Sequence, residues 1–151
     1  TFLFDEYVDY TWTSQPHNAV GFAEGEVIGG NLSLLVESLG TATEIDTTGK
    51  ILLIEEIDEY LYKVDRMLNQ LRRAGKFDSL KGVIVGSFSE MKDTNIPFGK
   101  NKYEVINRYF SGLEVPVSFD APFGHTLTNY ALPLGYPLKY KVTDQRVYLS
   151  N

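Results

Sequence analysis

The 151-residue sequence contains no cysteine, which excludes a disulfide framework and a zinc–thiolate site and fits a reducing compartment. Only two histidines occur, without H-x-H or H-x-x-x-H spacing, so we expect no metal site. Positive charge is also scarce: 14 Lys and Arg stand against 20 Asp and Glu, a formal net charge of −6. This balance argues against a nucleic-acid or anionic-membrane surface. No apolar run approaches the roughly 18–20 residues that span a membrane.

The composition that remains is typical of a globular protein. Hydrophobic residues make up 43% of the chain, which is enough to form the hydrophobic core of one domain. The chain starts at Thr1 rather than Met, and its opening residues lack the basic region and cleavage site of a signal peptide. We interpret this start as the edge of a longer protein. The hydrophobic residues of 1–20 show no clear period of two or 3.6. This segment is predicted to be a linker or leading segment that is irregular or contains short strands.

Hydrophobic patterning after residue 20 predicts alternating strands and helices. Short continuous apolar runs indicate strands buried on both faces, and apolar residues three to four positions apart indicate helices. The predicted strands cover 26–28, 50–56, 81–88, 115–119, 138–142 and 146–149, and the predicted helices 32–39, 59–73 and 103–110. This order predicts a single α/β domain, with a mostly parallel, helix-covered sheet and an antiparallel end.

The chemistry-bearing residues follow the predicted strands, at the sheet edge where α/β proteins place their sites. Glu55 ends an apolar run, and a carboxylate there must be paired or hydrogen-bonded. His125 lies in a Pro- and Gly-framed loop after strand 115–119. Structural roles, a salt-bridged Glu and a hydrogen-bonded loop His, are the alternatives to catalysis. The acids Glu56, Asp58 and Glu59 are explained more simply by the positive end of the following helix.

A glutamate with a histidine suggests acid–base catalysis, in which the carboxylate orients the imidazole. The nucleophile is missing, because the sequence has no Cys and no G-x-S-x-G turn. Ser87 and Ser89 follow a strand without that turn, so we interpret them as structural. The Gly29-Gly30 pair before a helix could hold an anion, but the fuller glycine-rich pattern is absent.

Three segments, taken in order, resemble one family. They are GEVIGGNLSLLVESLGT, KILLIEEIDEYLYKVDRMLNQLRRAGKF and FGHTLTNYALPLG. Together they resemble the C-terminal domain of the serine LD-carboxypeptidases, that is, the murein-tetrapeptide carboxypeptidases and the related microcin C self-immunity peptidases. The resemblance implies that residues 21–151 form this domain, of the swivelling β/β/α type, and that the N-terminal nucleophile domain lies outside this chain.

The resemblance implies a Ser-Glu-His triad whose Ser belongs to the N-terminal domain, with Glu55 and His125 as the matching acid and base. Gly29, Gly30 and Asn31 are expected to shape the substrate cleft, with a turn-and-cap role as the alternative. The implied reaction needs no metal or cofactor. It hydrolyses the amide between an L-configured diamino-acid centre and a terminal D-Ala in murein tetrapeptides during cell-wall recycling.

The partners implied by the resemblance are the murein peptide, the nucleophile domain and a second copy in a homodimer, all in the cytoplasm. Two other functions stay open: a non-catalytic α/β module that binds peptides or partners, and a microcin-type immunity peptidase that cleaves an acyl-amide linked to a nucleotide. An upstream domain with a Ser elbow would favour an enzyme. By itself the chain is expected to fold but not to catalyse.

Overall fold

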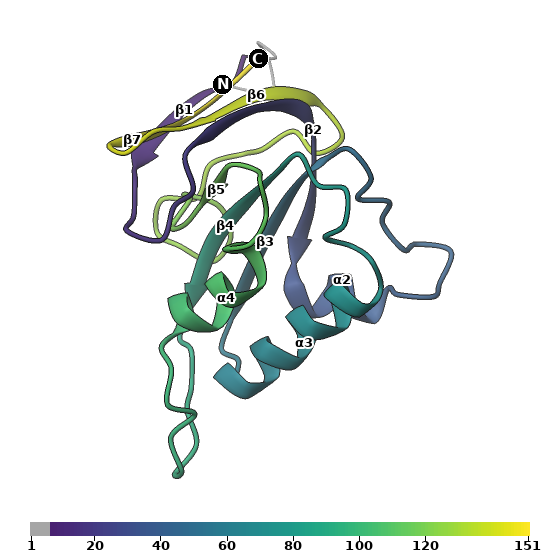
Figure 1. The fold of residues 1–151 in the computed structure, drawn as a ribbon, viewed down its shortest axis with the longest axis vertical. Coiled ribbons are helices and arrows are strands. Elements are labelled where there is room, and N and C mark those ends of the chain that lie inside the picture. Colours follow the sequence, from purple (N-terminus) through teal and green to yellow (C-terminus); the bar gives the residue numbers. More distant parts are fainter. Residues whose placement is uncertain (1–6) are drawn as a thin grey trace.

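The computed structural model describes residues 7–151, so residues 1–6 of the predicted leading segment lie outside it. Residues 7–151 contain seven strands and three helices, and the helices lie between strands in the middle of the chain (Figure 1). The strands are β1 (Asp9–Thr13), β2 (Gly21–Asn31), β3 (Ile51–Ile57), β4 (Gly82–Ser89), β5 (Val117–Ser118), β6 (Pro137–Val142) and β7 (Arg146–Ser150). The helices are α2 (Leu32–Glu37), α3 (Leu61–Arg73) and α4 (Lys102–Phe110).

The strands form one mixed sheet in the order β1-β7-β6-β2-β3-β4-β5. The pairs β2–β3, β3–β4 and β4–β5 are parallel, and the pairs β1–β7, β7–β6 and β6–β2 are antiparallel. The predicted α/β domain with an antiparallel end is confirmed. The parallel half (β2, β3, β4 and β5) and the antiparallel half (β1, β7, β6 and β2) have the same number of strands, with β2 counted in both. β2 belongs to both halves, because its first part pairs with β6 and its last five residues pair with β3.

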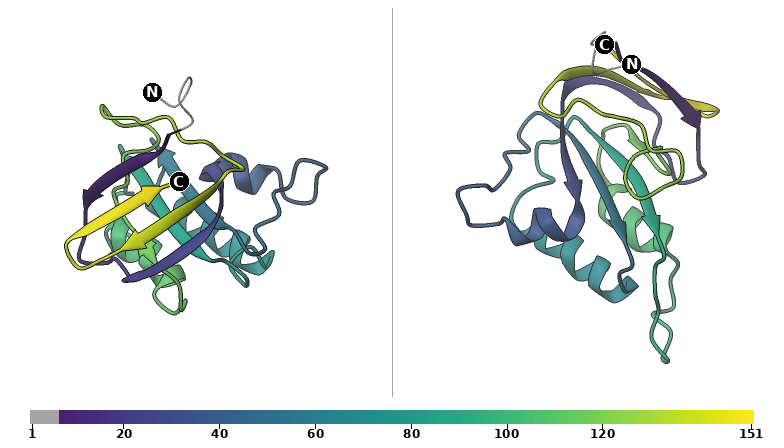
Figure 2. Two further views of the ribbon diagram at one scale, coloured as in Figure 1. Left: turned by 90° about the horizontal axis from the view of Figure 1, so that it is seen from above. Right: turned by 180° about the vertical axis from the view of Figure 1, so that it is seen from behind.

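Two hydrophobic clusters lie on opposite faces of the parallel half. One cluster joins this half to the three helices, and the other joins it to the antiparallel half, which folds over it (Figure 2). Successive β3 residues alternate between the clusters: Leu52 and Ile54 pack toward the helices, whereas Ile51 and Leu53 pack toward the antiparallel strands. Burial on both faces explains why β3 begins as an unbroken apolar run.

The predicted helical stripe of α3 is confirmed, because Leu61, Val64, Leu68 and Leu71 are its buried residues. The predicted start at Glu59 is wrong: the helix begins at Leu61, after an extended Tyr60, and no acid lies in its first turn. The preceding Asp58 has a left-handed backbone (φ 59°), which a continuing right-handed helix excludes. In α4, Asn101 and Glu104 form a reciprocal capping box.

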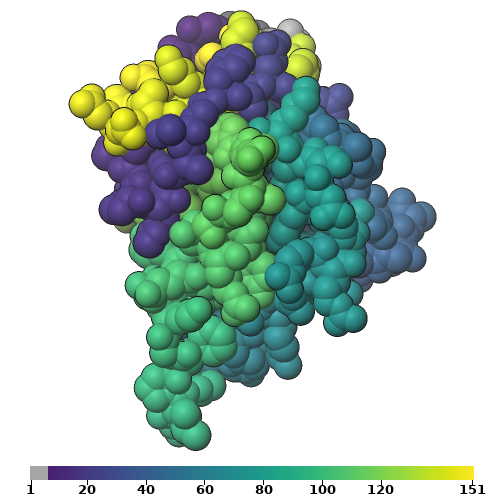
Figure 3. Space-filling view, in the orientation of Figure 1, coloured from purple at the N-terminus to yellow at the C-terminus, as the bar shows by residue number. Residues whose placement is uncertain are grey.

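The short β1 lies within the segment predicted as irregular or short-stranded, and it pairs with β7 from Asp9 opposite Ser150 to Thr13 opposite Arg146. β2 begins at Gly21, earlier than the predicted strand at 26–28. Two loops project from the body, one between α2 and β3 and one between β4 and α4 (Figures 1 and 3). None of the helices within residues 7–151 has the length and apolarity to cross a membrane.

Candidate active site

Glu55 lies near the carboxyl end of β3, where the pairing with β4 is irregular. Ile54 pairs with Val85, but Glu56 pairs with Phe88, so β4 carries one more residue than β3 between the two pairs. Such a bulge redirects the side chains beside it. Glu55 continues the β3 alternation away from the helices, and only 7% of the residue is exposed.

Two glycines pack directly against the Glu55 side chain. A Cβ added at Gly124 would lie 2.6 Å from Glu55 Oε2, and one added at Gly86 would lie 3.3 Å from Glu55 Cβ and 2.6 Å from the Phe123 carbonyl oxygen. Gly124 also has φ +97°, which disfavours any side chain. Sequence reasoning missed Gly86, although an isolated Gly within a strand pattern is the usual signal of a close backbone approach.

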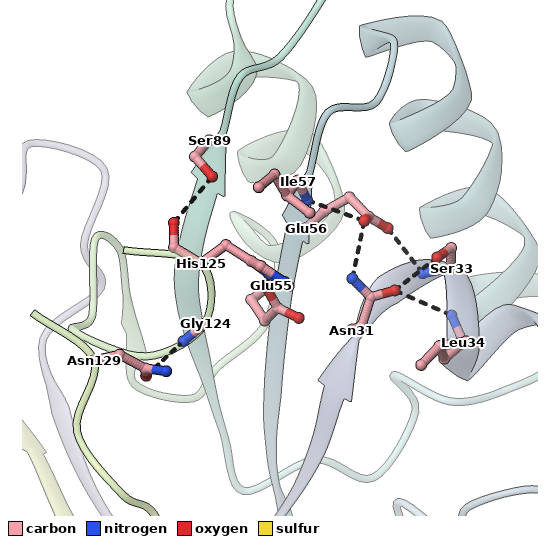
Figure 4. Close-up of polar contacts among 10 residues, drawn as sticks. All are labelled: Asn31, Ser33, Leu34, Glu55, Glu56, Ile57, Ser89, Gly124, His125 and Asn129. Carbon is pink, nitrogen blue, oxygen red and sulfur yellow. Dashed lines mark hydrogen bonds and ion pairs between the residues drawn. The ribbon is translucent and has the colours of Figure 1, made fainter. Parts of the chain in front are cut away.

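The loop after β5 carries His125 and is tied to β4. Ala121 N donates to the Val85 carbonyl (3.1 Å), and Ser87 N donates to the Phe123 carbonyl (2.9 Å). Ser89 Oγ then donates to the backbone carbonyl of His125 itself at 3.1 Å. Inside the loop, Gly124 N donates to Asn129 Oδ1 at 3.2 Å (Figure 4). These bonds hold the imidazole at the end of the parallel strands. Nothing in the sequence had marked Asn129.

His125 and Glu55, 70 positions apart in the sequence, meet in the structure. The Nδ1 atom of His125 lies 2.8 Å from Glu55 Oε2 (Figure 4). The Glu55 side chain is 9% exposed, but that of His125 is 51% exposed. An ionised carboxylate can only accept, so it holds the imidazole proton on Nδ1 and leaves Nε2 with a free lone pair. The pair can therefore take up a proton at Nε2.

A pocket of about 240 Å³ lies beside His125. Its lining combines hydroxyl, apolar and charged side chains from β4, the start of α4 and the loop after β5. The lining residues are Ser87, Phe88, Ser89, Lys102, Asp120, Ala121, Pro122, His125, Thr126 and Thr128. Asp120 has φ 53°, a left-handed conformation that is uncommon outside glycine and is enriched at functional sites.

Glu56 points to the opposite side of the sheet from Glu55 and binds the start of α2. Its Oε1 accepts from Asn31 Nδ2 (2.9 Å) and its Oε2 accepts from Ser33 N (3.0 Å). The residue is 4% exposed. The expectation that Glu56 serves the following helix is wrong, because β3 alternation directs it to α2, the preceding one.

The three residues predicted to shape the cleft, Gly29, Gly30 and Asn31, lie at the end of β2. Asn31 caps α2, its Oδ1 accepting from Leu34 N (3.3 Å). A Cβ at Gly29 would lie 1.9 Å from the Leu53 carbonyl oxygen, so only glycine fits there. Gly30 has φ +144° and open space around it. Contact of these three residues with a substrate stays a prediction.

The remaining polar residues singled out by sequence take part in local contacts. Asp58 forms an ion pair with Lys92, and Glu59 lies 3.1 Å from Lys63 Nζ. His17 stacks on Tyr103 with ring centroids 5.7 Å apart. Within residues 7–151, no group of three or more His, Asp or Glu side chains is arranged to hold a metal ion.

A family model described as the LD-carboxypeptidase C-terminal domain matches residues 24–139. The chain belongs to the LD-carboxypeptidase family. As an LD-carboxypeptidase C-terminal domain, it contains the Glu55–His125 pair within the matched range.

Several relatives support this membership. The chain is 39% identical over 137 residues to the probable murein peptide carboxypeptidase of Bacillus subtilis, an alignment covering 88% of this chain and 43% of that protein. The structure of muramoyltetrapeptide carboxypeptidase from Oxalobacter formigenes superposes with a TM-score of 0.88 at 32% identity, covering 97% of this chain and 50% of that one. The microcin C7 self-immunity protein MccF of Escherichia coli is 28% identical over 131 residues, which cover 86% of this chain and 38% of MccF. The chain thus spans half or less of the length of these relatives.

Proposed function

We propose that this LD-carboxypeptidase domain supplies the base and its orienting acid to a serine peptidase acting on murein tetrapeptides. The observation that carries the proposal is the 2.8 Å contact between His125 Nδ1 and Glu55 Oε2. A carboxylate–imidazole pair with one exposed ring nitrogen is the acid–base part of a Ser-His-acid triad. Family membership and the carboxypeptidase names of the relatives point to the same reaction class.

The mechanism follows from which nitrogen is free. His125 Nε2 accepts the proton of a Ser hydroxyl from the nucleophile domain while the Ser oxygen attacks the carbonyl carbon of the scissile amide. The imidazolium then returns that proton to the departing amine, and an acyl-enzyme is left. A water molecule repeats the two steps and releases the acid. Glu55 stabilises the imidazolium throughout and keeps the ring in its orientation.

The proposed substrate bond joins the L-configured centre of the diamino acid to the terminal D-alanine. The proposed partners are the murein peptide, the N-terminal nucleophile domain of the same protein and a second copy in a homodimer. A cytoplasmic location, where recycled murein peptides would be processed, belongs to the same proposal. Residues 21–151 are proposed as the catalytic-pair domain; residues 1–20 lead into it, and β1 from this segment joins its sheet.

The test uses the full-length protein and follows D-alanine release from a murein tetrapeptide. His125→Ala is expected to lower kcat by about 10³-fold or more, since triad residues act as a unit. The matched control is His17→Ala, which removes the only other histidine and a ring stack on Tyr103 but leaves the Glu55 contact intact. Equal rates for wild type and His125→Ala would contradict the proposal.

A second candidate function is favoured by the match to MccF. One solved MccF structure, 25% identical to this chain with a TM-score of 0.77, is a complex with glutamyl sulfamoyl guanosine. The same full-length protein is therefore assayed against an aminoacyl sulfamoyl nucleoside. Faster turnover of that compound than of the tetrapeptide would assign the domain to an immunity peptidase. No turnover of either would favour the non-catalytic module.

A further inference from the structure

Lys102 places a positive charge in the pocket beside His125. It is the first residue of α4 and is half-buried, and its side chain lines the pocket. The ammonium donates one hydrogen bond, from Nζ to the Phe88 carbonyl oxygen at 2.9 Å. An ammonium has three N–H donors, so Lys102 can still donate to a ligand in the pocket.

No carboxylate of residues 7–151 neutralises this charge. None of the ion pairs within 4.0 Å among these residues involves Lys102. Asp120, the acid in the pocket lining, accepts from Tyr103 Oη with both oxygens, at 2.9 and 3.1 Å. Lys92, which also follows β4, is paired with Asp58. Lys102 thus has no ion-pair partner among the described residues, and its ammonium lies 5.1 Å from the centroid of the Tyr103 ring.

The pocket has room for a small anionic group beside Lys102. Its volume of about 240 Å³ is several times the roughly 30 Å³ that one water molecule occupies. Ala121 and Pro122 supply apolar lining, and Thr126 and Thr128 supply hydroxyls. A half-buried ammonium without a counter-charge gains most from a carboxylate, because a charge-assisted hydrogen bond is stronger than a neutral one.

We propose that Lys102 binds the free α-carboxylate of the residue to be released. The inference rests on the proposed function, under which that residue is a terminal D-alanine next to the scissile amide. Lys102 would then make the domain selective for chain ends: a substrate whose terminal carboxylate is amidated or extended leaves the ammonium without its partner.

Kinetics of the full-length protein provide the first test. Lys102→Met keeps the stem but removes the charge, and is expected to raise KM for the tetrapeptide roughly tenfold, the value of one charge-assisted bond. The value of kcat is expected to change little, because the carboxylate is bound equally in the ground and transition states. Lys102→Arg is expected to recover part of the loss. The matched control Lys100→Met removes an equal charge from an exposed neighbour outside the pocket lining and is expected to leave KM unchanged.

Binding provides a test that does not depend on turnover. In full-length protein carrying His125→Ala, calorimetry compares the tetrapeptide with its C-terminal amide, with and without Lys102→Met. We expect the acid to bind about tenfold more tightly than the amide, and Lys102→Met to abolish that preference. An unchanged preference, or no tetrapeptide binding, would overturn the role of Lys102. Tetrapeptide binding without wild-type hydrolysis would instead overturn the proposed function alone.

Discussion

Glu55 and Glu56 are adjacent and chemically alike, yet they have separate roles in the structure. Glu55 faces the loop after β5 and contacts His125, whereas Glu56 faces α2 and accepts hydrogen bonds from Asn31 and Ser33. Successive side chains of a strand point to opposite faces, which is sufficient to separate them. Both are buried, and each has its own hydrogen-bond partners. The proposed role of Glu55 is to orient His125 for proton transfer, whereas Glu56 anchors the start of α2.

This division predicts opposite outcomes for the two conservative variants. In the full-length protein, Glu55→Gln is expected to lower kcat by orders of magnitude, because the amide no longer stabilises the imidazolium. Glu56→Gln is expected to retain the rate but to lower the free energy of unfolding by about 1–3 kcal/mol, since a buried acceptor loses its charge-assisted bonds. D-alanine release and urea unfolding measure the two effects. A Glu55→Gln enzyme with the wild-type rate would move the acid role to Glu56 or Asp58.

Tyr103 makes the stability of the domain sensitive to alkaline pH. Partial burial, and then the hydrogen bond to Asp120 and the charge of that carboxylate, raise the pKa of Tyr103 from 10.0 to about 12. The fold therefore favours the neutral phenol. This contribution is complete below pH 10, the unfolded value, and is lost as the pH rises through about 12.

Urea unfolding between pH 9 and pH 12 tests the shift. Tyr103→Phe cannot ionise, so its stability is expected to fall less steeply than that of the wild type above pH 10. Burial, and then the hydrogen bond to Asp65, also raise the pKa of Tyr109 to about 12. The variant Tyr109→Phe therefore provides a parallel test. Identical pH profiles for Tyr103→Phe and the wild type would show that the phenol is unperturbed.

Among the elements, α4 carries both a structural cap and the proposed carboxylate-binding lysine. Asn101 Oδ1 accepts from Glu104 N at 3.0 Å, while Glu104 Oε2 accepts from Asn101 N at 2.8 Å. The cap fixes where the helix begins and hence where Lys102, the next residue, emerges beside β4. The position of the pocket lysine thus depends on a local sequence signal.

Removing the cap is expected to destabilise the domain modestly. Asn101→Ala should lower the free energy of unfolding by about 1 kcal/mol, the usual value of an N-cap side chain. Asn107→Ala, within the same helix, is the control and is expected to cost less, because alanine has the higher helix propensity. Thermal unfolding followed by circular dichroism measures both. A loss at Asn107 equal to that at Asn101 would contradict the capping role.

On the scale of the whole molecule, β2 joins two half-sheets of different character. Its first part pairs antiparallel with β6, and its last part pairs parallel with β3 (Figure 2). The antiparallel half thereby covers one face of the parallel half and leaves the strand ends with Glu55 and His125 at one edge. Among the described residues, the hydrogen bond of the His125 imidazole is to Glu55, and no hydroxyl is hydrogen-bonded to the ring.

Isolated, this chain is therefore expected to fold but to release no D-alanine from a murein tetrapeptide. Adding the nucleophile domain should restore turnover, because the missing hydroxyl then reaches His125 Nε2. The measurement is D-alanine release by the chain alone, by the chain with the added domain, and by the same mixture carrying His125→Ala. Hydrolysis that survives His125→Ala would contradict both the assignment and the role of the histidine.

The sequence by itself determined the elements whose signals are local. The ILLI run predicted a strand buried on both faces, the leucine spacing predicted α3, and the motifs around Glu55 and His125 identified the family. Helix caps and apolar periods depend on residues a few positions apart, so they can be recognised in a single sequence.

Only the tertiary structure decided which residues meet. The pairing of β1 with β7 and the reach of Glu56 to α2 join residues far apart in the sequence, and neither was predicted. The Glu55–His125 pair was expected only from the family resemblance, and the structure adds the 2.8 Å distance between the two side chains. A sequence records no signal for such pairings, because they depend on the order and twist of the strands in the sheet and on a bulge beside Glu55. The order and the bulge arise from packing energy summed over the whole core rather than from any local pattern.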